Sequence, residues 1–174
     1  MVTIPLVVLS FLLAFLRGGR LNRDIPGIWY PVVGVLVQVS LSHLFPGTLL
    51  GRMAVVLGYL SVLPFLWLNR RSQGLALAAL GLLLNLAVIT ANGGLMPVDN
   101  ELAAARGITV AEGELAKHQP MGPDTRLALL GDVIPVPPIP TLFSIGDLLL
   151  DLGAFLFIQE AMGLTLRRWR PHPG

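Results

Sequence analysis

The chain has 174 residues, of which 54% are hydrophobic and 13% are charged, and its mean hydropathy is +0.75. These values lie outside the range of ordinary soluble domains and indicate a membrane protein. The absence of cysteine excludes disulfides, thiol catalysis and thiolate metal sites, and the net charge of +2 indicates membrane topology rather than nucleic-acid binding, because the arginines stand beside apolar runs.

Five apolar segments are long enough, or nearly so, to cross a bilayer, since a helical span needs roughly 20 apolar residues. They predict transmembrane helices at about 1–16, 28–45, 49–68, 74–92 and 145–166, with one long loop over 93–144. The first segment has neither a preceding basic residue nor a small-residue cleavage site, so we interpret it as a retained helix and not as a signal peptide. The prediction is a single all-α membrane domain over residues 1–174.

Arginines follow the first, third and fifth predicted helices. They are Arg17, Arg20, Arg23, Arg70, Arg71, Arg167, Arg168 and Arg170. With five spans these arginines fall on one side of the membrane, which the positive-inside rule makes cytoplasmic. We therefore expect a multi-pass protein of the inner (plasma) membrane, with the N-terminus and the long loop outside and the C-terminus in the cytoplasm.

Two predicted helices carry small and polar residues on one face. The stripe in the fourth helix consists of Gly74, Gly81, Asn85 and Asn92, and the stripe in the second consists of Gly34, Gln38 and Ser42. Either the small residues allow close helix packing while the amides bond across helices, or the stripes line a polar cavity open to the outer face. The second interpretation makes Asn85 and Asn92 candidate binding residues.

The long loop contains several local signals. Thr109 and Glu112 form a capping-box pattern that predicts a short helix over 110–118. Prolines make residues 133–140 extended, and the glycines after Asn92 indicate a helix C-cap. Because function concentrates in such loops, we expect the functional site on this face.

Three carboxylates surround the start of the last helix. Ser144 and Asp147 form an S-x-x-D capping pattern, which gives Asp147 a structural role. Asp132 precedes the proline segment. Asp151 lies one turn deeper, where an unpaired carboxylate is costly, and it is a candidate binding residue that needs a partner. Candidate partners on the outer side are Arg52, Arg126, His43, Asn85 and Asn92.

Other chemistry is absent from the sequence. His43 and His118 have no second ligand at metal spacing, so no metal site is expected. There is no phosphate-binding loop, dinucleotide fingerprint, nucleophile elbow or zincin motif, and no cofactor is predicted.

Three motifs in chain order resemble a family. They are RGGRLNRD after the first helix, NGGLMPV after the fourth, and LGDVIPVP followed by FSIGD before the fifth. Together they resemble a bacterial group of small integral membrane proteins classified only as a domain of unknown function. The resemblance implies a membrane fold and a role for the outer-face motifs, and it names no activity.

A second, local resemblance concerns the last helix. FSIGDLLLDLGAFLFI is similar to the final span of bacterial lipoprotein signal peptidases, in which a catalytic aspartate opens the helix at the outer face. This similarity implies that role for Asp147, with Ser144 in place of the family's asparagine. GPDTRL resembles the segment that carries the second catalytic aspartate, which implies that role for Asp124.

Three functions are left open by these observations. The first is a non-enzymatic binding or accessory subunit, whose partners are membrane lipid and other membrane protein subunits and not nucleic acid. The second is a membrane-embedded hydrolase that pairs Asp147 with Asp132 or Asp124, one as general acid and one as base. The third is a small transporter or proton path that uses Asp151 and the amide stripes. Arg126 is a candidate binding residue together with Asn85, Asn92 and Asp151.

Overall fold

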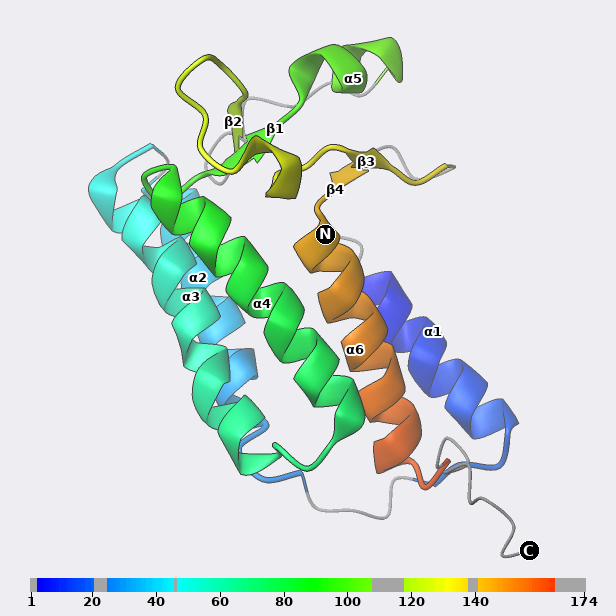
Figure 1. Cartoon of the computed structure of the whole chain (residues 1–174). Helices are drawn as coiled ribbons and strands as arrows, with labels where there is room; N and C mark the ends of the chain where they lie inside the picture. Colours follow the sequence, from blue (N-terminus) through cyan, green and yellow to red (C-terminus); the bar gives the residue numbers. More distant parts are fainter. Residues whose placement is uncertain (1–2, 21–24, 46, 108–117, 138–140, 165–174) are drawn as a thin grey trace, which may run out of the picture.

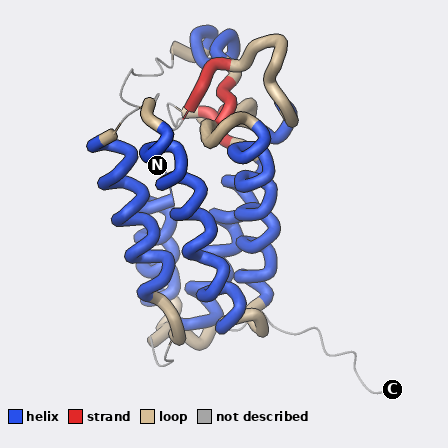
Figure 2. Tube along the Cα trace, turned by 90° about the vertical axis from the view of Figure 1, so that its left-hand side faces the viewer, coloured by secondary structure: helices blue, strands red, loops and turns tan. Residues whose placement is uncertain are grey.

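A computed structural model of the chain describes residues 3–20, 25–45, 47–107, 118–137 and 141–164. The protein is mostly helical. Five apolar helices stand side by side as a bundle, and the segment between the fourth and the fifth folds over one end of it (Figures 1 and 2). We call this folded segment the cap and its end of the bundle the cap end.

The bundle helices begin and end close to the predicted positions. They are α1 (Thr3–Leu16), α2 (Trp29–Leu44), α3 (Leu49–Leu68), α4 (Gln73–Ala91) and α6 (Ile145–Ala161). The prediction was wrong about the end of α6, because Gly163 at φ +79° ends the helix. The amide of Leu164 reaches back to the carbonyl of Gln159 at 2.9 Å, as in a Schellman motif.

Two of the described helices, α3 and α4, are long and apolar enough to cross a membrane, and α2 is a shorter apolar helix.

The bundle has an inverted distribution of polarity, the reverse of that in a soluble protein, with apolar side chains outside and polar side chains inside. Large apolar side chains on its outside are exposed, including Leu36 at 61%, Leu57 at 55% and Leu83 at 53%. Polar side chains are buried within it, namely Ser10, Gln38, Ser42, Asn85, Asp151 and Gln159.

Glycines set the close approach of α4 and α6. A Cβ on Gly74 would lie 2.7 Å from the carbonyl oxygen of Gly153, and one on Gly81 would lie 2.6 Å from the amide nitrogen of Leu150. A Cβ on Gly146 would overlap the side chain of Asn85. These contacts confirm the close-packing interpretation of the stripe in α4.

The stripe in α2 also faces a neighbouring helix. Gly34, Gln38 and Ser42 are the buried residues of α2, and a Cβ on Gly34 would overlap Ser61 of α3. Gln38 of α2 lies against Gly58 of α3. Gly34 of this stripe and Gly58 of α3 therefore serve helix packing as well.

The cap contains short strands, so the all-α prediction holds for the bundle and not for the whole chain. The cap comprises β1 (Met96–Val98), α5 (Asn100–Ala105), β2 (His118–Pro120), η2 (Ala128–Leu130), β3 (Ile134–Pro135) and β4 (Leu142–Phe143). Strands β1 and β2 pair in parallel, β3 and β4 pair antiparallel, and a bridge joins Val98 to Asp132. Most of the helix predicted over 110–118 lies outside the described residues, although His118 belongs to β2. The extended conformation predicted for 133–140 is confirmed at β3, and residues 138–140 lie outside the described part.

Asn92 holds the cap on α4. Gly94 donates to the carbonyl of Ile89 at 2.8 Å, with φ values of +69° and +91° at Gly93 and Gly94, so the predicted C-cap is confirmed. The Asn92 side chain donates to the Arg126 carbonyl at 2.8 Å and accepts from the Arg126 amide at 3.0 Å. This two-bond contact, the Asn92 clamp, fixes a turn of the cap above the end of α4.

The other end of the bundle carries the described arginines of the predicted cytoplasmic group, and we call it the basic end. Arg17 lies just past α1 and contacts Gln159 of α6 at 3.4 Å, while Arg70 and Arg71 lie between α3 and α4. Arg23, Arg167, Arg168 and Arg170 lie outside the described residues. Clustering at one end agrees with the predicted sidedness of the arginines.

Candidate functional site: an acid pair beneath the cap

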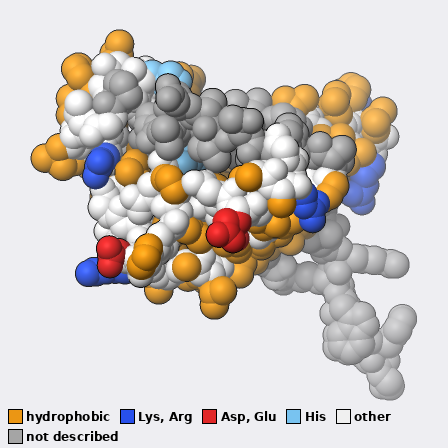
Figure 3. Space-filling model, turned by 90° about the horizontal axis from the view of Figure 1, so that it is seen from above, with side chains coloured by type: hydrophobic (Ala, Val, Ile, Leu, Met, Phe, Trp, Pro, Cys, Tyr) orange, Lys and Arg blue, Asp and Glu red, His pale blue; other side chains and the backbone are white. Residues whose placement is uncertain are grey.

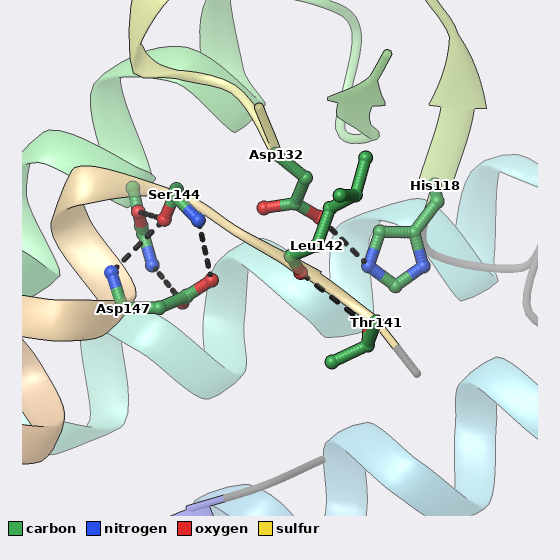
Figure 4. A network of polar contacts seen from close by, with 7 residues as sticks. His118, Asp132, Thr141, Leu142, Ser144 and Asp147 are labelled. Carbon is green, nitrogen blue, oxygen red and sulfur yellow. Dashed lines mark hydrogen bonds and ion pairs between the residues drawn. The ribbon is translucent and has the colours of Figure 1, made fainter. Parts of the chain in front are cut away.

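Asp147 stands at the start of α6 and forms hydrogen bonds with Ser144, the N-cap of this helix, and with Asn85 of α4. Ser144 accepts from the Asp147 amide at 2.9 Å, and the Asp147 carboxylate accepts from the Ser144 amide at 3.2 Å. This reciprocal pair is the predicted capping box, which is confirmed. Asn85 of α4 donates to Asp147 Oδ1 at 2.7 Å and accepts from the Ser144 hydroxyl at 2.9 Å (Figure 4).

The three side chains form a closed network at the cap end. Both Asp147 oxygens accept from N–H donors, an arrangement that suits an ionised carboxylate. Asn85 is fully buried and Ser144 likewise, so leaving either without its partners would be costly. Asn85 therefore belongs to an internal network that fastens α4 to α6.

Asp132 lies close to this network and is placed by the cap. Its amide donates to the carbonyl of Pro97 at 2.8 Å, and its carbonyl accepts from the amide of Asp99 at 3.1 Å, so the backbone of β1 fixes it. Its side chain is buried, with the residue 5% exposed. Oδ1 is buried without a hydrogen bond from the described residues.

Burial and the nearby charge of Asp147 raise the pKa of Asp132 from 3.8 to about 8. Desolvation is the larger cause, because it disfavours the ionised form, and repulsion from Asp147 acts in the same direction. At neutral pH Asp132 therefore keeps its proton beside the Asp147 carboxylate, both of whose oxygens accept hydrogen bonds. The sequence does not reveal this difference, because burial of Asp132 depends on how the cap folds.

Two further side chains lie near Asp132 and Asp147, which we call the acid pair. His118 Nε2 lies 3.5 Å from Asp132 Oδ2 (Figure 4). The side chain of His118 is 31% exposed, so the imidazole links the buried acid to the surface. The phenol of Tyr59, from α3, lies beside Asn85 and within electrostatic range of Asp147 and Asp132. Neither was a candidate from the sequence, where no local pattern places α3 or β2 against α6.

The other predicted site residues lie elsewhere. Asp124 is exposed in the turn closed by Gly122 and Thr125, and the side chain of Arg126 is exposed on the surface of the cap. Asn92 is engaged in the clamp. Asp151 is 7% exposed, one turn below Asp147 on the buried face of α6, and its predicted partner stays a prediction.

The described residues contain no group of three or more histidine, aspartate or glutamate side chains that could hold a metal ion. Asp132 and His118 alone offer two ligands. The arrangement is instead suited to proton exchange between a buried acid and the surface, and to hydrogen bonding of a polar group near Asp132.

Comparison with protein families identifies the chain. Residues 43–159 match a family of unknown function, DUF5317, and the chain belongs to this family. The matched region runs from the end of α2 into α6 and includes the cap and the acid pair. No curated protein and no solved structure matches the chain. The resemblance to a family of unknown function is thus confirmed, and the similarity to lipoprotein signal peptidases is not shown by these comparisons.

Proposed function

We propose that this chain is a multi-pass protein of the inner (plasma) membrane, with five transmembrane helices, the basic end in the cytoplasm and the cap outside. The inverted polarity of the bundle supports this, because buried polar groups beneath exposed leucines suit a lipid surround and not water. The shorter α2 and α6 stand beside α3 and α4, and α1 stands beside α6 (Figure 1), so a bilayer around the long helices also surrounds them.

Reporter fusions to the full chain test this topology. Green fluorescent protein fused after Gly174 should fluoresce, because it folds in the cytoplasm, while alkaline phosphatase inserted after Gly107 should be active only outside. The opposite pair of results would refute the orientation. Recovery of the chain without membranes after cell lysis would refute the membrane location.

Within the membrane, the chain acts as a non-enzymatic binding or accessory subunit whose partner is another membrane protein. The observation that carries this role is the apolar turn, Leu127–Leu129, at the cap end. Leu127 adopts a left-handed φ of +54°, a conformation that costs a non-glycine residue about 1 kcal/mol or more. The Asn92 clamp holds this turn through Arg126.

The leucines of the apolar turn gain little burial in return for this strain. Leu127 is 49% exposed and Leu129 is 83% exposed. Seen from the cap end, the described surface carries scattered charges among apolar side chains and no single charged patch (Figure 3). A partner that covers both leucines would offset the strain by burying apolar surface.

Native mass spectrometry of the full chain, extracted with surrounding native lipid, tests this role. We expect a complex heavier than the 18.7 kDa chain, reduced about tenfold or more by Leu129→Ser, because an exposed anchor is lost while the fold is untouched. Arg106→Gln, another exposed cap substitution, should leave the complex unchanged. A lone wild-type chain, or a complex that survives Leu129→Ser, would contradict the proposal.

A second candidate function is a membrane-embedded hydrolase, and the acid pair is the observation that favours it. Two carboxylates whose environments separate their protonation states can act as general acid and general base. Asp132 would supply the proton and Asp147 would activate water. Against this role, both oxygens of Asp147 already accept structural hydrogen bonds.

Cleavage of a lipid-linked peptide by the purified chain distinguishes the two functions. A hydrolase should lose activity at least about a hundredfold in Asp132→Asn and in Asp147→Asn. Asp124→Asn is the matched control, because Asp124 is exposed and outside the acid pair. Full activity in Asp147→Asn would exclude this mechanism.

A further inference from the structure

A groove runs along the bundle surface between α3 and α4 at the basic end. It has a volume of about 530 Å³, within the range of small-molecule sites. Its walls are Leu63, Pro64 and Trp67 from α3 and Ala79 and Leu83 from α4. Proline inside α3 and the small side chain of Ala79 leave room between the helices.

Arg70 lines the same groove at the basic end. From Leu63 to Arg70 the groove extends over seven residues, or roughly 10 Å along the helix axis. The groove thus joins a cation at the membrane boundary to an apolar channel long enough for the upper part of an acyl chain.

The guanidinium of Arg70 is held in place but is not neutralised. It lies 4.7 Å from the centre of the Trp67 ring, a cation–π distance, and its Nη1 donates to the Trp67 carbonyl at 3.2 Å. In the part of the chain that the structure describes, neither Arg70 nor Arg71 forms an ion pair.

One carboxylate at the basic end, that of Glu160, is already engaged in hydrogen bonds. Glu160 of α6 accepts from the Ser72 hydroxyl at 2.5 Å and from the Gly74 amide at 3.3 Å. It thereby caps the start of α4, where a negative charge is favourable. Arg70 in the lining of the groove and the exposed Arg71 beside it in the chain therefore carry positive charges that form no ion pair among the described residues.

We infer that this groove binds one anionic phospholipid, with its phosphate on Arg70 and Arg71 and an acyl chain between α3 and α4. Basic pockets between helices on the cytoplasmic side suit such headgroups, and each arginine contributes roughly fivefold in affinity. The inference rests on the proposed membrane topology and concerns the end of the bundle opposite the cap.

A second groove on the bundle can be compared with the groove between α3 and α4. This second groove, of about 660 Å³, lies between α2 and α3 and is lined by Trp29, Tyr30 and Val33 among others, and the described residues of its lining include no charged side chain. It offers apolar contact without a cation. An acyl chain there should bind without preference for headgroup charge.

Fluorescence quenching by brominated lipids tests the inference in vesicles. Trp29→Phe with Trp169→Phe leaves Trp67 as the reporter of the α3–α4 groove, and Trp67→Phe with Trp169→Phe leaves Trp29 as the reporter of the α2–α3 groove. Each full-length variant is reconstituted in phosphatidylcholine with increasing brominated phosphatidylglycerol or brominated phosphatidylcholine.

Half-maximal quenching of Trp67 should require a lower fraction of brominated phosphatidylglycerol than of brominated phosphatidylcholine, by about fivefold or more. Trp29 should be quenched equally by both lipids. Arg70→Gln should reduce the preference at Trp67 about fivefold, whereas Arg70→Lys, which keeps the charge, should retain most of it. Arg106→Gln, on the cap, should leave it unchanged.

Equal quenching of Trp67 by the two lipids, or a preference that Arg70→Gln leaves undiminished, would overturn the lipid site while leaving the membrane topology intact. Quenching ratios within each variant remove the direct effect of Arg70 on Trp67 emission. Quenching of neither tryptophan would overturn the membrane topology and the lipid site together.

Discussion

Replacing Asp132 with asparagine should change how the stability of the fold depends on pH. Asparagine has nearly the shape of a protonated aspartic acid and cannot ionise. The substitution therefore preserves the neutral form that the buried site favours, and it removes the proton equilibrium. The backbone bonds of Asp132 to Pro97 and Asp99 do not involve the side chain and should persist.

The sign of the effect follows from the raised pKa. In the folded chain Asp132 keeps its proton up to a pKa of about 8, compared with an ordinary value of 3.8. Between these values the folded state binds more protons than the unfolded state, so stability falls as pH rises. The contribution of the protonated acid is fully present below about pH 4 and is lost as the pH rises through 8.

The magnitude has an upper limit set by the same values. A difference of about four pH units corresponds to about 6 kcal/mol, at about 1.4 kcal/mol per unit. Entry of water around the ionised acid reduces the cost, so we expect a wild-type loss of a few kcal/mol between pH 5 and 8. Asp132→Asn should lose much less and should be the more stable protein at pH 9.

Unfolding in detergent micelles, followed by tryptophan fluorescence at pH values from 5 to 9, measures this difference. Asp124→Asn is the control, because it removes an exposed carboxylate and should retain the wild-type pH dependence. The reasoning would be refuted if Asp132→Asn kept the wild-type slope. It would also be refuted if the infrared carbonyl band of a protonated aspartic acid at this site disappeared well below pH 7.

Three further substitutions test the packing of the bundle and the cap. Gly153→Ala should reduce the free energy of unfolding by about 3 kcal/mol or more, because the new Cβ would overlap backbone atoms of α4. Gly122→Ala is the control and should be nearly neutral, because a Cβ there meets nothing within 4 Å. Equal effects of the two substitutions on unfolding would show that α4 and α6 are not this close. Asn85→Ala should reduce the free energy of unfolding by about 2 kcal/mol, since it leaves polar partners unsatisfied, and a neutral result would argue against the network. Asn92→Ala should speed tryptic cleavage after Arg126 about tenfold, because two hydrogen bonds to that backbone are lost; unchanged cleavage would argue against the clamp.

The local signals in the sequence predicted much of this structure. Apolar length and helix caps located α3 and α4 to within one or two residues, because a run of apolar residues and a capping side chain act through neighbours in the chain. The capping box of Ser144 with Asp147 and the turn after Asn92 were predictable for the same reason. The end of α6 was missed because the glycine at 163 outweighed the apolar residues beyond it.

Tertiary packing decided the candidate site. Asp132 and His118 come from the cap and Tyr59 comes from α3, and only the fold of the cap and the packing of the bundle bring them to Asp147. Asp124 and Asp132 are the same residue type, but Asp124 is exposed, whereas burial beside another charge raises the pKa of Asp132. Composition and spacing therefore determined that this chain builds an apolar bundle with acids at one end, while the depth of each acid and the neighbours that surround it depended on long-range contacts that no local pattern encodes.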